Sequence, residues 1–382
     1  MPDKRLLFIL PCGFGISLAI GIVNLGMLFL IKESYGAGPA LVGWFTALWA
    51  GAYFLGCIAF RPLSRRIDAA TSAFLMGLIS ALVLAAQFLA PSLASAFAAS
   101  TLYGFACALV WPRIMGWLAT GLEGAALSRA YGTYNLSWSG GMTLAPYVAG
   151  LLSERDLNLP IYVGIALFFS LGLYMLAGRR IAPAPSGPAA SASPSAIRPQ
   201  DRSTPLRYPA WIGLFAVYIL YSVFNNIFPL YAKDELAMGE SGIGLLLLLR
   251  AASMSLCFWI IGRLSFWQFK LGFLPAALAS SVALALGFIF VKSPLGFVLG
   301  LTLLGLAQAS AYSLSIFYGA SGAPDRDKRM SVHEAVLTAG QIVGSVGGGA
   351  AYQSFSWPMV FVLVAGIALV CVPIQLVLVR KR

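Results

Sequence analysis

Two titratable side chains lie next to each other at the start of a glycine-rich apolar segment. His333 is the only histidine in the chain, and Glu334 is the only acidic residue inside any long apolar segment. A carboxylate removed from water favours its neutral form, and an imidazole changes its charge near neutral pH. Both are therefore candidates for binding and releasing protons. The alternative is a helix start, where Glu334 would stabilise the helix dipole and His333 would be solvated.

Polar residues follow Glu334 along one face of the same segment. They recur at helical spacing, at Glu334, Thr338, Gln341 and Ser345. A stripe of small residues lies beside them, at Gly340, Gly344 and Gly348. This pattern predicts a helix that lines a polar cavity or contacts another helix closely.

Two arginines fall inside apolar segments, where a charge is costly and usually faces a partner or water. Arg250 lies near the middle of its segment, and Arg113 lies in the last third of another. A guanidinium group binds a carboxylate or phosphate through two parallel hydrogen bonds, so both are candidate ligands of an anionic solute. Two alternatives stay open: Arg113 could reach lipid headgroups, and Arg250 could pair with Glu334.

Long apolar segments must position these groups. The chain has 382 residues, of which 59% are hydrophobic and only 10% are charged, a composition that excludes an ordinary soluble protein. A transmembrane helix needs about 20 mostly apolar residues. We predict an all-α polytopic membrane protein with twelve transmembrane helices, at 6–31, 40–60, 69–90, 94–119, 131–152, 160–177, 208–231, 242–262, 272–291, 295–318, 332–352 and 357–378.

The positive charge is distributed unevenly between the predicted loops. With both termini cytoplasmic, most of the 25 lysines and arginines lie in cytoplasmic segments, as the positive-inside rule requires. We therefore predict a multi-pass protein of the inner (cytoplasmic) membrane with both termini in the cytoplasm. The net charge of +12 is spread over short loops, so it indicates topology and contact with membrane lipid, and we expect no nucleic-acid partner.

One polar stretch divides the chain. APAPSGPAASASPSAIRPQDRSTPLR, residues 182–207, is rich in Pro, Ala and Ser and cannot pack a core. We predict an N-terminal six-helix bundle at 1–181, a flexible cytoplasmic linker at 182–207 and a C-terminal six-helix bundle at 208–382.

The two halves align with each other at a nearly constant spacing. TLYGFACALVW, residues 101–111, aligns with TLLGLAQASAY, residues 302–312, and Asn24 aligns with Asn225 at the same spacing. Other matched pairs are Lys32 with Lys233, Gly43 with Gly244, and Asn135 with Glu334. The steady spacing indicates an internal duplication, which is the architecture of many secondary transporters.

GTYNLSWSGGMTLAPYVAG, residues 132–150, places small residues regularly around a proline. It resembles the helix-five motif of antiporters of the major facilitator superfamily, G-x8-G-x3-G-P-x2-G-G, with two glycines replaced by alanine. The matching positions are Gly132, Gly141, Ala145, Pro146, Ala149 and Gly150. The resemblance implies a bacterial secondary transporter whose helices form two pseudo-symmetric six-helix bundles. In that superfamily the motif is associated mainly with drug/proton antiporters.

Small residues three and four positions apart let two helix backbones approach closely. We expect such residues to serve gating or packing, at Gly132, Gly141, Pro146, Gly150, Gly340 and Gly344. Plain helix packing is the alternative. A second motif of the superfamily, between helices two and three, is altered in GCIAFRPLSRR, residues 56–66. Arg61 remains as a candidate gating residue, but Phe60 replaces the usual acid.

Helices one, four, seven and ten line the central cavity in proteins that this chain resembles. Candidate substrate-binding residues there and on the polar face of helix five are Asn24, Tyr103, Trp111, Asn135, Tyr218, Tyr221, Asn225 and Gln308. Thr338 and Gln341 join them from the polar stripe, together with the two arginines. An aromatic cavity with a few polar groups suits an amphipathic organic solute, although ordinary packing also explains single aromatic residues.

These features favour a monomeric, proton-coupled secondary transporter of a small organic solute that is anionic or zwitterionic. The helix-five motif favours efflux. A broad-specificity drug/proton antiporter is the alternative, but it normally needs an acid in the N-terminal spans, where the sequence has none. A passive facilitator also stays open. We expect no enzyme, cofactor or metal site, because no metal cluster, nucleotide loop or nucleophile–base pair is recognisable.

Overall fold

The apolar segments form helices whose first residues carry recognisable start signals. Asp68 accepts a hydrogen bond from the backbone of Thr71, and Ser92 and Ser95 cap each other reciprocally, which satisfies amide groups that a helix start leaves free. Pro39 begins the second helix, where its missing N–H costs nothing. The computed structural model describes residues 4–60, 67–111, 113–114, 124–178, 204–264, 266–323 and 326–380.

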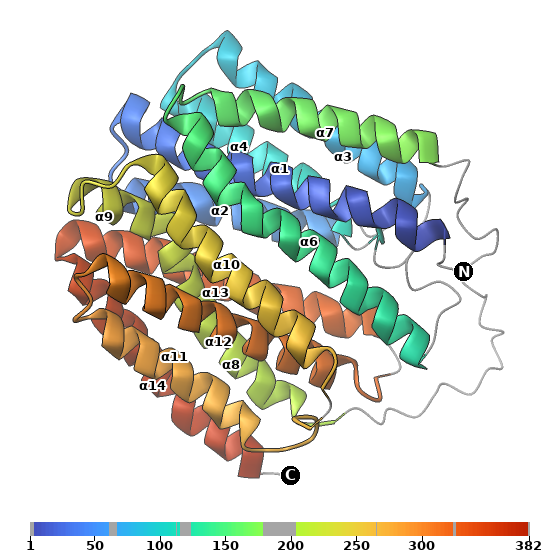
Figure 1. Ribbon diagram of the computed structural model, residues 1–382, viewed down its shortest axis with the longest axis vertical. Helices are drawn as coiled ribbons and strands as arrows, with labels where there is room; N and C mark the ends of the chain where they lie inside the picture. Colours follow the sequence, from blue (N-terminus) through green and yellow to red (C-terminus); the bar gives the residue numbers. More distant parts are fainter. Residues whose placement is uncertain are drawn as a thin grey trace.

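The N-terminal half contains six long helices. They are α1 (Lys4–Tyr35), α2 (Pro39–Ala59), α3 (Ala69–Ala86), which is extended by a short 3-10 turn, η2 (Gln87–Leu89), α4 (Leu93–Cys107), α6 (Gly124–Ser153) and α7 (Leu159–Gly178). Figure 1 shows them as one group, coloured from blue to green.

The C-terminal half repeats this pattern. It consists of α8 (Arg207–Ser222), a π-helix, η3 (Val223–Ile227), α9 (Phe228–Asp234), α10 (Glu240–Ile261), α11 (Phe273–Phe288), α12 (Pro294–Ala320), α13 (Arg326–Ser354) and α14 (Trp357–Arg380). α8, η3 and α9 together form one membrane-length helix. The described residues thus supply the twelve predicted transmembrane helices, and the predicted fold class is confirmed.

Not every helix is apolar enough to be recognised as a membrane span by composition. Eight helices of the described residues meet that condition, and α4 and α11 are apolar but shorter. The long helices α6 and α13 do not, because polar residues and glycines interrupt their sequences. These two helices carry the glycine motif and the polar stripe, so the least apolar helices are the ones with candidate functional residues.

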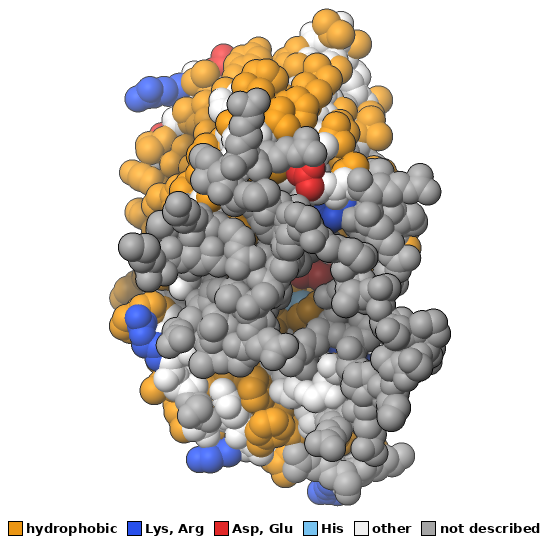
Figure 2. Space-filling view, turned by 90° about the vertical axis from the view of Figure 1, so that its right-hand side faces the viewer, with side chains coloured by type: hydrophobic (Ala, Val, Ile, Leu, Met, Phe, Trp, Pro, Cys, Tyr) orange, Lys and Arg blue, Asp and Glu red, His pale blue; other side chains and the backbone are white. Residues whose placement is uncertain are grey.

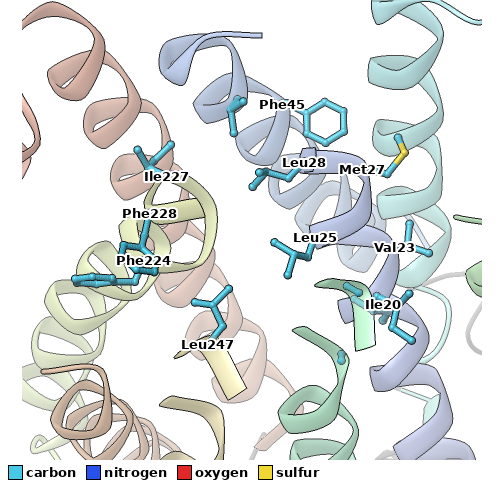
Figure 3. Close-up of a cluster of buried hydrophobic side chains, with 14 of the residues drawn as sticks. Ile20, Val23, Leu25, Met27, Leu28, Phe45, Phe224, Ile227, Phe228 and Leu247 are labelled. Carbon is cyan, nitrogen blue, oxygen red and sulfur yellow. The ribbon is translucent and has the colours of Figure 1, made fainter. Parts of the chain in front are cut away.

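The two halves meet along two pairs of helices, α2 with α13 and α6 with α10. One buried apolar cluster continues across this junction, with Leu25 and Phe45 from one half and Phe224 and Leu247 from the other (Figure 3). Most of the predicted linker, 182–203, lies outside the described residues. The domain limits therefore stay a prediction, although Leu206 near the end of the linker is already buried in the C-terminal half.

The molecule has two ends, which we name by the chain segments they carry. The termini end contains the first residues of α1 and α8 and the last residues of α7 and α14. Figure 1 shows the chain ends N and C on that side. The opposite, far end carries the connections 36–38, 154–158, 235–239 and 355–356.

Candidate functional site

A cavity of about 290 Å³ lies between the two halves. Its walls come from α1, α2, α4 and α6 on one side and from α8, η3, α10, α12 and α13 on the other, with Trp111 from the region after α4. Among the described lining residues only Arg250 and Glu334 are charged. Both belong to the C-terminal half, so one half provides the charge of the described lining.

Arg250 is held at the cavity wall by its own backbone and by its side-chain partners. Gly305 of α12 lies directly against its carbonyl oxygen, which also accepts a 2.7 Å hydrogen bond from Ser253. The guanidinium group donates a 2.6 Å hydrogen bond to Gln308 and lies 4.7 Å from the ring centre of Tyr221. Its Nε is buried without a partner in the described structure, so the group retains capacity to bind an anion.

The alternative pairing of Arg250 with Glu334 is not formed between these two described residues. The guanidinium group donates its hydrogen bond to the side chain of Gln308 instead, which is a neutral amide. The positive charge of Arg250 is therefore not neutralised by a neighbouring carboxylate. An uncompensated buried cation is costly, and a solute anion would remove that cost.

Glu334 lines the same cavity and is half-buried. α13 begins at Arg326, more than two helical turns before Glu334, so the helix-start alternative is wrong for this residue. Tyr53 and Cys57 of α2 and Tyr312 of α12 lie close enough to interact with its charge. The carboxylate therefore lies at the junction of the two halves.

His333 has a different environment from its neighbour. It is buried, its Nδ1 lies 2.7 Å from the hydroxyl of Ser315, and its ring packs edge-on against Tyr312 at 4.8 Å. It does not belong to the cavity lining, and the solvated alternative is wrong. His333 supports the back of Tyr312, which does line the cavity.

The glycine stripe of α13 packs this helix on α8 within the C-terminal half. Gly340 faces the backbone of Phe215, and Gly344 faces Ser222, so any side chain there would push the helices apart. The close approach lets Ser222 donate a 2.7 Å hydrogen bond to the carbonyl of Gln341. Gln341 lines the cavity, whereas Thr338 is buried outside the lining.

A polar network connects the π-helix to this seam. Asn226 donates hydrogen bonds of 3.1 Å to Ser222 and 2.9 Å to Ser345, and Asn225 donates one of 3.1 Å to Asn226. Asn225, Asn226 and Ser345 all line the cavity. π-helices often mark functional sites, and this one brings two consecutive amide side chains to the cavity.

Most of the other predicted substrate-binding residues also line the cavity. These are Asn24, Trp111, Asn135, Tyr218, Tyr221, Asn225 and Gln308. Tyr103 lies behind the wall and donates a 3.1 Å hydrogen bond to Asn24. Arg113 is outside the lining, and its charge interacts with Asp68 at the start of α3. A role in binding stays a prediction for all of these residues.

Several lining residues were missed by the sequence analysis. Trp138 and Tyr312 are the most prominent, with ring centres 6.3 Å apart across the cavity. Trp138 donates a 2.9 Å hydrogen bond to Asn135 and follows it by three positions, and Tyr312 follows Gln308 by four. Helical spacing from a recognised residue was the signal that could have identified them.

The two seams between the halves have matching glycine contacts. In the α2/α13 seam, Gly43 faces the carbonyl of Ser345, and Gly349 faces that of Pro39. In the α6/α10 seam, Gly244 faces the carbonyl of Pro146, and Gly150 faces that of Glu240. A side chain at any of these glycines would overlap the facing backbone.

The other motif residues do not share this position. Gly141 faces the carbonyl of Phe14 in α1, inside the N-terminal half, and Gly132 has no neighbour within 4 Å of the place where a Cβ would lie. Arg61 lies outside the described residues. Only Pro146 and Gly150 of the helix-five motif therefore lie at the interface between the halves.

Charged pairs and helix caps also match across the far end. Lys32 binds Asp234 at 2.6 Å, and Lys233 binds Glu33 at 3.1 Å as well as Glu240. The far end is thus closed by ion pairs between the halves, formed by the two lysines that the sequence alignment of the halves matches.

Each half also caps a helix of the other half. Gln353 at the end of α13 accepts a 2.9 Å hydrogen bond from the backbone N–H of Ala40 in α2. Glu154 after α6 accepts hydrogen bonds of 3.0 Å and 2.6 Å from the backbone and hydroxyl of Ser241 in α10. These two donors hold the pKa of the Glu154 carboxyl below its ordinary value.

The termini end differs from the far end. Figure 2 views this end and shows acidic and histidine side chains in a hollow between the upper and lower halves. Cavity residues that lead toward this end include Glu334, Leu337 and Tyr53. The structure is therefore closed at the far end, with Glu334 on the side of the termini end and Arg250 at the middle of α10.

Solved structures with the same fold include a human organic anion transporter, MFSD10 (TETRAN), with a TM-score of 0.67, 17% identity and coverage of 98% of this chain and 100% of that chain. A POT family transporter in complex with 5-aminolevulinic acid has a TM-score of 0.80 and 12% identity, covering 98% and 96%. Another, in complex with a thioalcohol-conjugated peptide, has a TM-score of 0.77 and 12% identity, with the same coverage.

No curated protein sequence matches the chain. The family model described as Major Facilitator Superfamily matches residues 9–325 and 210–382, which together cover nearly the whole chain. The twelve helices and the transporter neighbours agree with this match. The chain is a membrane transporter, not an enzyme, and it belongs to the major facilitator superfamily.

Proposed function

We propose that this transporter moves a small organic solute bearing a carboxylate, either an anion or a zwitterion, by proton-coupled alternating access. The observation that carries the proposal is Arg250, a buried guanidinium at the wall of the central cavity with an unpartnered Nε and no acidic neighbour bound to it. Tyr218, Tyr221 and Gln308 surround it with hydroxyl, ring and amide groups that suit an organic carboxylate.

Glu334 provides the proton site in this proposal. It is the single acid among the described lining residues and lies close enough to Tyr53 of the other half to interact with it electrostatically. A carboxylate at such a junction binds a proton when water is excluded and releases it when the junction opens. Protonation and solute binding then change the charge of one cavity, and this links the two fluxes.

Neighbouring structures agree with this class of solute without fixing it. One neighbour is an organic anion transporter, and another was solved with 5-aminolevulinic acid. The helix-five motif supports exchange of the solute for a proton, with the solute leaving the cell. We further propose that the protein works as a monomer in the inner membrane, with both termini in the cytoplasm and membrane lipid around it.

The test is transport by the purified protein in liposomes under an imposed pH gradient. Labelled small carboxylates and 5-aminolevulinic acid serve as solutes, and tetraphenylphosphonium serves as a lipophilic cation. Arg250→Lys keeps the charge but loses the planar fork, so carboxylate transport falls roughly 10- to 150-fold, the loss of one charge-assisted hydrogen bond. The matched control is Arg155→Lys, in an exposed far-end loop, which leaves transport unchanged.

Two outcomes would overturn the proposal. One is carboxylate transport at the wild-type rate by both Arg250→Lys and Arg250→Gln. The other is preferential transport of the lipophilic cation, which would restore the drug/proton antiporter.

A further inference from the structure

A second cavity lies on the outside of the C-terminal half, away from the junction of the halves. Its volume is about 780 Å³, and its walls are α10, α11, α12 and the loop residues Phe266 and Trp267. α10 and α12 separate it from the central cavity, because Gly305 packs directly against the backbone of Arg250. We call this space the lateral groove.

Small residues create the lateral groove. Those on α11 recur at helical spacing, at Ala276, Ser280, Ala283 and Gly287, and Gly300 and Ala307 of α12 join them. Small residues normally let helices approach closely, yet a Cβ at Gly287 would meet nothing within 4 Å. α11 packs against α8, α12 and α14 instead of α10, so the small residues line a space rather than a contact.

The groove opens toward the membrane. α10 and α12 are apolar helices of membrane-spanning length, and exposed side chains such as Leu303 and Phe266 lie at the edge of the groove. An apolar cavity holds water poorly and takes up apolar molecules. Hydrocarbon from the bilayer is the solvent available here, so an acyl chain is the expected occupant.

The loop beside the groove at the termini end carries positive charge, and its two basic residues lie outside the residues that line the groove. The loop GRLSFWQFKLG, residues 262–272, contains Arg263 and Lys270 and no acid, and both side chains are exposed. Arg263 lies 3.8 Å above the ring of Trp259. Tryptophan and basic residues together are typical of the membrane interface, where phosphate groups lie.

The loop between these two basic residues is held in shape. Trp267 lines the groove and donates a 2.8 Å hydrogen bond to the carbonyl of Leu264. Phe269 adopts a left-handed backbone with φ of 57°, a conformation that costs energy for such a residue. Ring contacts with Phe317 and Tyr318, at 5.3 and 5.8 Å, hold it there.

We propose that the lateral groove binds one anionic phospholipid from the leaflet at the termini end. One acyl chain lies along the small residues of α11, and the phosphate is bound between Arg263 and Lys270. This site does not depend on the identity of the transported solute, and α10 and α12 keep the lipid apart from that solute.

Native mass spectrometry of the delipidated full-length protein tests the proposal. Phosphatidylglycerol and phosphatidylcholine with the same acyl chains are titrated separately. We expect the first phosphatidylglycerol to bind more tightly, by about fivefold for each basic side chain at the membrane surface. Arg263→Gln with Lys270→Gln removes this preference and leaves phosphatidylcholine binding unchanged, and these exposed positions preserve the fold.

Two further variants separate the groove from other lipid contacts. Gly287→Phe fills the groove and weakens binding of both lipids. Solute exchange by this variant in liposomes confirms that it is folded. Lys292 lies at the other end of the groove, near the far end of the molecule, so Lys292→Gln keeps the preference for phosphatidylglycerol. Equal binding of both lipids by the wild type, loss of preference in Lys292→Gln, or displacement of the lipid by transported carboxylate would each overturn the proposal.

Discussion

The α2/α13 seam and the α6/α10 seam are built alike but carry different chemistry. Both place a glycine of one helix against the backbone of the other, and both end in a side-chain oxygen that caps the facing helix. Nearer the cavity they diverge: Thr143 and Ser255 are 3.0 Å apart in the α6/α10 seam, whereas Glu334 lies close enough to Tyr53 in the other to interact with it electrostatically.

The difference shows how a duplicated fold acquires direction. Asn135 occupies in α6 the place that Glu334 occupies in α13, and Asn135 is satisfied by Trp138 of its own helix. Trp138 also packs 6.2 Å from Phe258 of α10. The α6/α10 seam thus has contacts that can hold the halves together, and the α2/α13 seam has a group that can titrate.

Replacing Glu334, the one acid among the described lining residues, should produce the largest effect. Glu334→Gln keeps the shape and hydrogen-bonding capacity but cannot bind a proton, so we expect pH-driven accumulation to be lost. Solute exchange at equal concentrations continues, because Arg250 is untouched. Proton and solute fluxes measured together in liposomes decide this, and Asp156→Asn, which neutralises an exposed acid in a far-end loop, is the control. If Glu334→Gln still shows gradient-driven transport, Glu334 is not the coupling residue. Coupling then comes from His333 or from ionisation of the solute, or does not exist.

The glycine contacts should behave alike in both seams. Gly43→Val and Gly244→Val each force a side chain into facing backbone, and overpacking of about 1–3 kcal/mol shifts the population away from the closed far end by roughly 5- to 150-fold. Distances between spin labels at the far end measure the shift. Gly132→Val, where the structure has open space, is the control. A large effect in one seam only would contradict the equivalence of the two seams.

The two lysines at the far end should have similar effects. Lys32 binds Asp234 and Lys233 binds Glu33 across the halves, whereas the pair of Lys233 with Glu240 lies within the C-terminal half. Lys32→Gln and Lys233→Gln should therefore open the far end to a similar extent. Exposed ion pairs are each worth about 0.2–1 kcal/mol, so the expected change is below about fivefold per pair. Added salt should reduce both effects. Effects that do not depend on salt would mean that the pairs do not hold the end closed.

The smallest effect concerns the two caps. Bonding to Ser241 lowers the pKa of Glu154 from its ordinary 4.5, so its contribution to the closed far end is complete above pH 4.5. It is lost as the pH falls through the lowered value. Glu154→Gln should remove this acid-sensitive opening, which spin-label distances measured against pH would show. Gln353 caps the equivalent helix with an uncharged side chain. Gln353→Glu should therefore introduce the same acid-sensitive opening in the α2/α13 seam.

Much of this arrangement follows from the sequence. The constant spacing between halves anticipated the matched pairs Lys32 with Lys233 and Gly43 with Gly244, because a duplicated backbone places equivalent residues at equivalent contacts. The isolated charge of Arg250 marked the cavity wall, since a charge in an apolar helix must face a partner or a cavity. Apolar periodicity therefore identified the helices, and the exceptions to it identified the site.

Other features depend on tertiary contacts that no spacing reveals. α13 begins at Arg326 rather than near residue 332, because a charged first turn resembles a loop in composition. His333 is buried because Ser315 and Tyr312 of another helix cover it. Gly132 fits the helix-five motif, but a Cβ placed there would meet no described atom within 4 Å. For His333 and Gly132, the surrounding residues determine how the position is packed, and the residue type alone does not.

The location of both cavity charges in one half has an electrical consequence. With Arg250 positive and Glu334 negative the empty site is neutral. A bound proton makes it +1, and a bound monovalent anion makes it −1. Exchange of the anion for a proton would then move two charges per cycle, and a membrane potential acts on each with about 2.3 kcal/mol per 100 mV. Joint movement of the anion and the proton would carry none. The voltage dependence of transport therefore reports the direction of the coupled cycle.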